Sequence, residues 1–162
     1  MILRRKDKQI NDRKLIEKIL DTALVCRIAM CKDNVPYLVT MNYAYTDNCL
    51  FLHSAQKGQK IDILKSNPRV CFEIDHGKKL LPSKIPCENT MQFISLIGTG
   101  SVIFLNDEDE KSKVLSLLLK KYTHMDQYEF SVHQLRKVLT FKICIDSITG
   151  KQSVQKDTLD RI

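Results

Sequence analysis

The sequence predicts a mainly β fold, a six-stranded antiparallel split β-barrel with helices packed over its ends. Three strand-like segments follow one another through short turns, which is the order of an antiparallel meander. A single short helical segment interrupts them, and three longer strand-like segments complete the set. The regular strand–helix alternation of a parallel sheet is missing, so a small barrel fits best. The expected strands are residues 24–31, 35–45, 49–53, 69–75, 91–105 and 137–146.

Three helices are expected around these strands. The first spans residues 11–23, with Asn11 as its N-cap, and closes one end of the barrel. The second spans residues 58–66 and ends before a proline. The third begins at Asn106 as its N-cap and runs to about residue 122, with an acidic first turn that suits the helix dipole.

Turn residues and glycines mark the connections. Short turns are expected at residues 32–34 and 46–48, and another at residues 147–150. Residues 76–89 contain one glycine and two prolines and are expected to form a loop. Gly98 and Gly100 interrupt the longest strand, where glycine indicates a bulge or the close approach of another backbone.

Length and composition indicate one ordinary globular domain, with residues 1–150 forming the barrel domain and residues 151–162 a C-terminal tail. The six cysteines include no Cys-x-x-Cys pair, so we expect free thiols and no metal site. No apolar run is long enough for a membrane span, and charges begin at Arg4, so a cytoplasmic protein is expected. The net charge of +7 favours anionic partners.

One segment carries a chemical signal, the stretch from Phe51 to Lys60. A strand ends in His53 and Ser54, passes Lys57 and Gly58, and enters a helix that carries Lys60. Backbone N–H groups at a helix start favour an anion, and a lysine beside them adds a compact positive charge. Glycine allows a ligand to approach the backbone closely. The segment is therefore a candidate phosphate site.

Four motifs in order extend this signal into a family resemblance. They are Val35-Pro36-Tyr37-Leu38-Val39-Thr40-Met41-Asn42-Tyr43, the His-Ser-Ala-x-x-Gly-x-Lys segment from His53, Asn67-Pro68-Arg69-Val70-Cys71-Phe72-Glu73, and Ser95-Leu96-Ile97-Gly98-Thr99-Gly100. Together they resemble the FMN-binding split-barrel superfamily of pyridoxamine 5′-phosphate oxidase. Within it, the chain is most similar to the branch of 5-nitroimidazole-resistance proteins, over residues 4–151.

The resemblance implies a homodimer with two flavin sites at the subunit interface, holding FMN or, as an alternative, FAD. The strand of residues 38–43 would lie along the isoalloxazine ring, and His53 and Ser54 beside the ring edge and the ribityl chain. Lys60 would bind the phosphate within the basic segment, and the other subunit would contribute loop and strand residues. The implied cofactor-binding residues are Thr40, Met41, Asn42, His53, Ser54, Lys57, Gly58, Lys60, Cys87, Glu88, Ser95 and Lys151.

The function implied is that of an FMN-dependent oxidoreductase. Reducing equivalents from NAD(P)H or another donor would pass through the flavin to a small acceptor such as a nitroimidazole or a quinone-like compound. His53 is the candidate catalytic residue, because a histidine can exchange a proton near neutral pH. Close relatives carry a tryptophan where this chain has Asn89, which leaves the acceptor pocket undefined.

Two other readings stay open. A non-catalytic split barrel could bind flavin or haem as a sensor or store, with His124 or His133 as an axial ligand. Nucleic-acid binding by a basic barrel is less favoured, because the aromatic residues fall inside apolar runs rather than on an exposed stacking surface. An optical spectrum of the purified protein separates flavin from haem.

Overall fold

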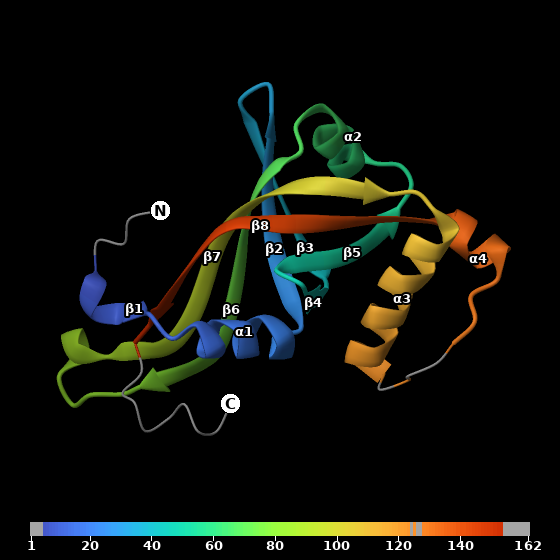
Figure 1. The fold of residues 1–162 in the computed structure, drawn as a ribbon. Coiled ribbons are helices and arrows are strands. Elements are labelled where there is room, and N and C mark those ends of the chain that lie inside the picture. The colour runs from blue at the N-terminus through green and yellow to red at the C-terminus, as the bar shows by residue number, and fades with distance from the viewer. Residues whose placement is uncertain (1–4, 124, 126–127, 154–162) are drawn as a thin grey trace.

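The computed structural model describes residues 5–123, 125 and 128–153 (Figure 1). Its α-helices are α1 (Arg13–Thr22), α2 (Gln59–Ser66), α3 (Glu108–Thr123) and α4 (Val132–Lys137). Its strands are β1 (Gln9–Ile10), β2 (Val25–Lys32), β3 (Val35–Asn42), β4 (Ala44–Thr46), β5 (Cys49–Ala55), β6 (Arg69–Leu81), β7 (Thr90–Leu105) and β8 (Val138–Gln152). Short 3₁₀ turns lie at Lys6–Lys8 and Pro86–Glu88.

The strands form one antiparallel sheet in the order β3-β2-β6-β7-β8-β5-β4, and β1 adds to the edge of β8. The two ends of this order, β3 and β4, are separated along the chain by one residue, Tyr43. The sheet therefore curls back on itself, but β3 and β4 do not pair and the barrel stays open. The predicted fold class is confirmed, with eight strands in the described residues where six were expected.

The hairpin turns have the geometry that their residues favour. Asp33 and Asn34 connect β2 to β3, and Asp47 and Asn48 connect β4 to β5, all four with positive φ. Two successive residues of positive φ make a type I′ turn, whose twist matches that of the flanking strands. Aspartate and asparagine tolerate this conformation, so both predicted turns form with two-residue loops.

The core lies inside the curled sheet and under α1. Alternate residues of β2, β6, β7 and β8 point inward and are fully buried, among them Ile28, Phe72, Leu96 and Ile143. The helix α1 packs over one end of this core through Ile16, Ile19 and Leu20. This confirms the expected role of the first helix.

Tyr43 fastens the turn between β3 and β4 into the structure. Its ring is fully buried, and its hydroxyl donates a hydrogen bond to the Leu20 carbonyl over 2.8 Å. The Lys121 ammonium lies 3.9 Å from the ring centroid, a cation–π contact. Burial lowers the pKa of Lys121 to about 8.

The predicted starts of two helices are corrected. The side chain of Asp12, not Asn11, accepts the backbone N–H of Lys14 and so caps α1. Likewise Asp107, not Asn106, accepts the Asp109 N–H at the start of α3. An aspartate one residue further on competes successfully in both cases because its carboxylate also complements the helix dipole.

The helix α4 was not predicted. Its start carries a capping box, in which Ser131 and the Gln134 side chain satisfy each other's backbone N–H groups. The Ser-x-x-Gln spacing is visible in the sequence, but the helix is too short to show an apolar period.

Several strand boundaries are also corrected. The expected strand at residues 35–45 is divided at Tyr43 into β3 and β4. Residues 76–81, expected in a loop, continue β6, with a register shift after His76. Residues 147–150, expected as a turn, lie inside β8, which runs on through Lys151 to Gln152 where a tail was expected. In residues 76–81 and 147–150, pairing to a neighbouring strand overrides the local turn preference.

Gly98 and Gly100 mark close approaches, as expected. A side chain at Gly98 would overlap the ring of the buried Phe72, and one at Gly100 would overlap the backbone carbonyl of Cys144. The pairing of β7 with β8 shifts register between Thr99 and Gly100, so the predicted bulge lies here.

We expect Gly100→Ala to lower the free energy of unfolding by about 1–3 kcal/mol. The added methyl group would overlap the backbone carbonyl of Cys144, which, unlike a side chain, cannot rotate away. Urea unfolding measures the change. The neighbouring Ser101→Ala, on the outer face of the same strand, is the control and should stay within about 0.5 kcal/mol of the parent. Equal stability of Gly100→Ala and the parent would contradict the tight β7–β8 packing.

Candidate functional site

The candidate site is the corner where β5 gives way to α2. Gly58 precedes α2 with a φ of 128°, and no side chain caps the helix start. A Cβ atom built at Gly58 meets nothing within 4 Å, so the space in front of the helix is open. The N–H groups of Ile61 and Asp62 bond to the Gly58 carbonyl, whereas the N–H groups of Gln59 and Lys60 have no partner among the described residues. Such an open, uncapped helix start favours an anion.

Lys60 supplies a positive charge at this corner. It is half-buried, and burial lowers its pKa. No carboxylate among residues 5–123, 125 and 128–153 forms an ion pair with it. A cation that is partly buried without a partner is electrostatically costly, and a bound anion removes that cost. Lys57 is exposed by comparison.

His53 lies close enough to Lys60 for the two groups to interact. Partial burial lowers the pKa of His53 first, and the positive charge of Lys60 lowers it further. Both effects favour the neutral form of the imidazole. A neutral ring has one nitrogen that donates and one that accepts, which suits proton exchange with a ligand.

Ser54 faces the other side of the strand. Successive residues of β5 alternate, so Ser54 points inward with Leu52 and is 8% exposed, while His53 points outward. The structure thus brings His53 and Lys60 together, and places Ser54 on the opposite face at the end of the strand.

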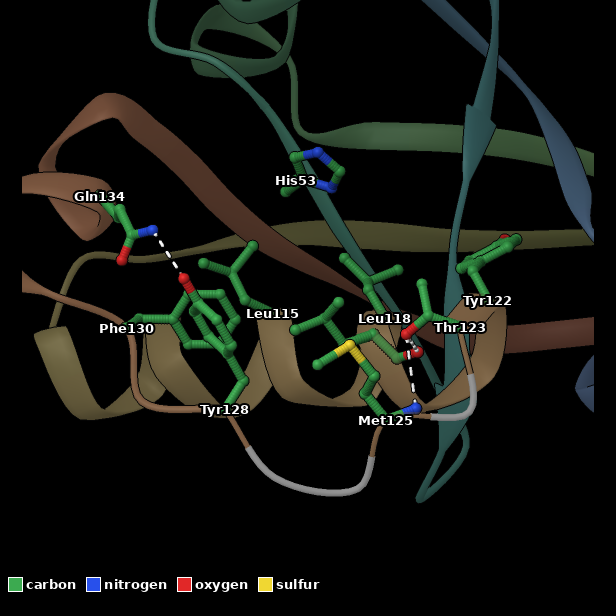
Figure 2. A pocket seen from close by; sticks show the side chains of 10 residues that line it. His53, Leu115, Leu118, Tyr122, Thr123, Met125, Tyr128, Phe130 and Gln134 are labelled. Atoms are coloured by element: carbon green, nitrogen blue, oxygen red, sulfur yellow. Dashed lines mark hydrogen bonds between the residues drawn. The ribbon is translucent and has the colours of Figure 1, made fainter.

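A hollow of about 370 Å³ opens in front of His53 (Figure 2). Its walls come from α3 and from the segment that leads into α4, and they are mostly apolar. Tyr128 and Phe130 stack edge to face with ring centroids 4.8 Å apart, and the Tyr128 hydroxyl accepts a hydrogen bond from Gln134 Nε2. The lining residues are His53, Leu115, Leu118, Leu119, Tyr122, Thr123, Met125, Tyr128, Phe130 and Gln134.

Tyr122 connects this hollow to β3. Its hydroxyl accepts the backbone N–H of Tyr43 over 3.0 Å and bonds to the Leu24 carbonyl. Burial raises the pKa of Tyr122, against the opposing effects of hydrogen bonds from the Tyr43 backbone and the Asn42 side chain. One side chain in the wall of the hollow therefore also holds the turn between β3 and β4.

The predicted β3 residues divide between two faces. Thr40 and Asn42 are exposed on the outer face, and Met41 is buried in the core. Met41 can therefore meet a ligand through its backbone alone. The exposed Leu38 continues the same outer face along β3.

Four predicted residues lie elsewhere in the chain. Cys87 and Glu88 are exposed in the 3₁₀ turn of the β6–β7 connection, at the far end of that hairpin from α2 (Figure 1). Ser95 pairs with Lys151 across β7 and β8. Within one chain, none of these four is brought to the β5–α2 corner.

Asn89 organises the β6–β7 connection. Its side-chain amide donates to the Pro86 carbonyl over 2.9 Å and accepts the Ser83 N–H over 2.9 Å. The connection is thus closed by polar contacts.

Sequence reasoning missed the contribution of α3 and α4 to the site. Leu115, Leu118 and Tyr122 recur at helical spacing, which indicates a packed face but not what it covers. Gln56 also reaches α4, where its amide donates to the Arg136 carbonyl. These contacts are made between segments about 80 residues apart, so spacing along the chain carries no sign of them.

Other candidate groups are placed as follows. His133 is exposed on α4, and His124 lies outside the described residues. Within the described part of the chain, no three His, Cys, Asp or Glu residues are grouped as metal ligands. No helix of the described residues is long and apolar enough to span a bilayer.

Comparison with known proteins identifies the family. The family described as pyridoxamine 5′-phosphate oxidase matches residues 12–152. A candidate 5-nitroimidazole antibiotic resistance protein from Bacteroides thetaiotaomicron superposes with a TM-score of 0.80 at 34% identity, covering 89% of this chain and 86% of that one. The chain therefore belongs to the pyridoxamine 5′-phosphate oxidase family, and its predicted likeness to the nitroimidazole-resistance branch is confirmed.

Two more distant structures share the fold alone. The flavocytochrome Anf3 from Azotobacter vinelandii has a TM-score of 0.82 at 13% identity, covering 95% of this chain and 73% of that one. A FAD-binding protein from Mesorhizobium loti has a TM-score of 0.68 at 24% identity, with 91% and 98% covered. The fold is thus one that flavin-binding proteins use.

A curated sequence relative matches over a shorter stretch. An uncharacterized protein from Rhizobium meliloti is 35% identical over 66 residues, which is 41% of this chain. The match spans 43% of that protein's length.

We expect Lys60→Gln to raise the pKa of His53, because a positive charge beside the imidazole is removed while its partial burial is kept. The chemical shift of the His53 ring proton, followed by NMR as a function of pH, measures this pKa. Lys65→Gln, at the far end of the same helix, is the matched control and leaves it unchanged. A pKa of His53 that is equal in both variants would contradict the placement of Lys60 beside the ring.

Proposed function

We propose that this protein is a flavin-dependent oxidoreductase that reduces a small aromatic acceptor. One arrangement carries the proposal: the uncapped start of α2 and Lys60, which has no ion-pair partner among the described residues, lie near His53, and His53 lines an apolar hollow. The start of α2 and Lys60 would take the phosphate of the flavin, and the hollow beside His53 would take the aromatic acceptor. Family membership and the flavin-binding neighbours of the same fold support it.

The flavin nucleotide fits the residues at the corner. Its phosphate would be bound by the free N–H groups at the start of α2 and by Lys60, with Gly58 leaving room for close approach. FMN is preferred to FAD, because the corner offers one anion site and opens to solvent. A bound flavin would supply the transfer of electrons, which the protein side chains lack.

The hollow beside His53 supports a planar aromatic acceptor. Leucine, methionine and aromatic side chains make most of its lining, so burial of an apolar ring is favourable there. The neutral imidazole can donate a proton to an acceptor that gains electrons. A nitroimidazole or a quinone-like compound has both features, and the Bacteroides relative is described as a resistance protein against the former.

A homodimer is part of this proposal. Leu38 is 60% exposed on the outer face of β3, next to Thr40 and Asn42, and a second subunit would cover it. Cys87 and Glu88 are remote from the corner of their own chain, so they can reach a flavin in the partner alone. NAD(P)H is the proposed electron donor.

The test of the proposal is the ligand of the purified protein. A flavin absorption band, with FMN identified by mass after release, is the expected result. A Soret band would favour the haem-binding alternative instead, and flavin that is retained but never re-oxidised by any acceptor would favour a sensor or store.

We expect Lys60→Glu to weaken flavin binding at least about 100-fold, since an attractive contact with the phosphate becomes repulsive. Fluorescence titration with FMN measures the affinity, and sedimentation shows whether the folded dimer persists. Lys65→Glu makes the same charge change on the same helix and should bind FMN like the parent. Full flavin occupancy of Lys60→Glu would show that the phosphate lies elsewhere.

We expect His53→Gln to keep its flavin but to reduce a 5-nitroimidazole about 100-fold more slowly, because the amide can hydrogen-bond but cannot deliver a proton. Stopped-flow absorbance of the pre-reduced protein, mixed with the nitro compound, measures the rate. His133→Gln, on the exposed face of α4, is the control. Equal rates for His53→Gln and the parent would remove His53 from the proposed chemistry.

A further inference from the structure

Two cysteines face each other across β5 and β8. Cys49 begins β5 and Cys144 lies directly opposite it in β8. Their sulfur atoms are 3.4 Å apart, with the Cys49 thiol directed at Cys144. The other four cysteines make no sulfur–sulfur contact in the described structure.

The hydrogen bonding of the ladder makes this pair suitable for a covalent link. The Ile145 N–H donates to the Asn48 carbonyl over 3.1 Å, so Asn48 and Ile145 form a hydrogen-bonded pair. Hydrogen-bonded and non-hydrogen-bonded pairs alternate along an antiparallel ladder, which makes Cys49 and Cys144 a non-hydrogen-bonded pair. In such pairs the Cα atoms lie about 4.5 Å apart and the side chains are closest, within the range that a disulfide spans.

Polar side chains next to the cysteine pair hold β5 and β8 together and leave the two sulfur atoms partly accessible to solvent. Asn48 Nδ2 donates to the Ile145 carbonyl over 3.0 Å, and Arg13 donates to Asn48 Oδ1 over 3.0 Å, so the strand ends are fixed beside the pair. Both cysteines are half-buried on the outer face of the sheet. Little backbone movement is therefore needed to bring the sulfurs into bonding distance.

We propose that Cys49 and Cys144 are a redox modification site, a dithiol that a peroxide converts to an intramolecular disulfide. This inference rests on the pairing of β5 with β8 and is independent of the proposed flavin chemistry.

The chemistry balances with a peroxide as oxidant. Burial, together with Cys144, raises the pKa of Cys49, against the opposing effect of the positive charge of Lys142, and Asp47 adds to the rise. Either sulfur can make the first attack. In the route from Cys144, its sulfur attacks one peroxide oxygen, the O–O bond breaks, and a sulfenic acid and one water form. Cys49 sulfur then attacks Cys144 sulfur, the S–S bond forms, the S–O bond breaks, and a second water leaves.

The link would join segments 95 residues apart in the chain. Closing so long a loop restricts the unfolded chain strongly, so oxidation stabilises the fold. A disulfide between half-buried cysteines on the outer face of the sheet stays within reach of a thiol reductant, which suits reversible control. Because His53 lies four residues along β5 from Cys49, the same link also restrains the strand that carries the candidate site.

The experiment treats the full-length protein with hydrogen peroxide and maps its cysteines by mass spectrometry without reduction. The expected result is a peptide pair joined through Cys49 and Cys144, with the loss of two hydrogens, reversed by dithiothreitol. Thermal unfolding should show a rise in Tm of roughly 5–15 °C on oxidation.

Variants make the outcome decisive. Cys49→Ser should show no rise in Tm and should leave Cys144 as a sulfenic acid that a 1,3-diketone traps. Cys31→Ser, a half-buried cysteine of β2, is the control and should oxidise like the parent. Free Cys49 and Cys144 thiols in peroxide-treated, folded parent protein, or a link to another cysteine, would overturn the proposal.

Discussion

The two-residue alternation of β5 is the constraint on which the site depends. Leu50 and Leu52 point into the core and are fully buried, so the register of the strand is fixed against β8. Because side chains alternate along the strand, this register places His53 on the outer face, toward α3. A slip of one residue would bury the imidazole and expose the leucines, which the loss of apolar burial forbids. The position of the candidate catalytic group is therefore a consequence of core packing.

The start of α2 carries a local positive charge, because its backbone N–H groups have no side-chain cap and Lys60 lies beside them. Most helix starts are closed by a side chain, as α1 is by Asp12 and α4 by Ser131. At α2 a glycine with positive φ stands in that position and contributes no side chain. Lys60 adds a half-buried charge that no carboxylate of the described residues balances. The uncapped helix start and the half-buried Lys60 lie side by side, so an anion bound at this corner would stabilise the folded protein.

The helix α3 joins the two halves of the site. Its Val114 and Leu118 pack on Ala44 and Leu105. The hydroxyl of its Tyr122 bonds to both the backbone N–H and the backbone carbonyl of Tyr43. Lys121 lies over the ring of the same tyrosine. Between β3 and β4, bonds from α3 to Tyr43 take the place of strand pairing, and the sheet stays split.

The sequence by itself determined the antiparallel class of the sheet, the short turns at residues 32–34 and 46–48, the helix closing the core and the Gly58–Lys60 segment at the corner, because each depends on residue type and short spacing. It did not determine the strand order, since the expected meander is interrupted where β3 and β4 do not pair. It failed at residues 76–81 and 147–150, where pairing with β7 extends a strand through residues that favour a turn. Only the tertiary structure decided that His53 and Lys60 interact while Ser54 faces away, that α3 and α4 wall the hollow, and that Cys49 meets Cys144. Those relations join segments far apart in the chain, and packing in three dimensions, not local preference, sets them.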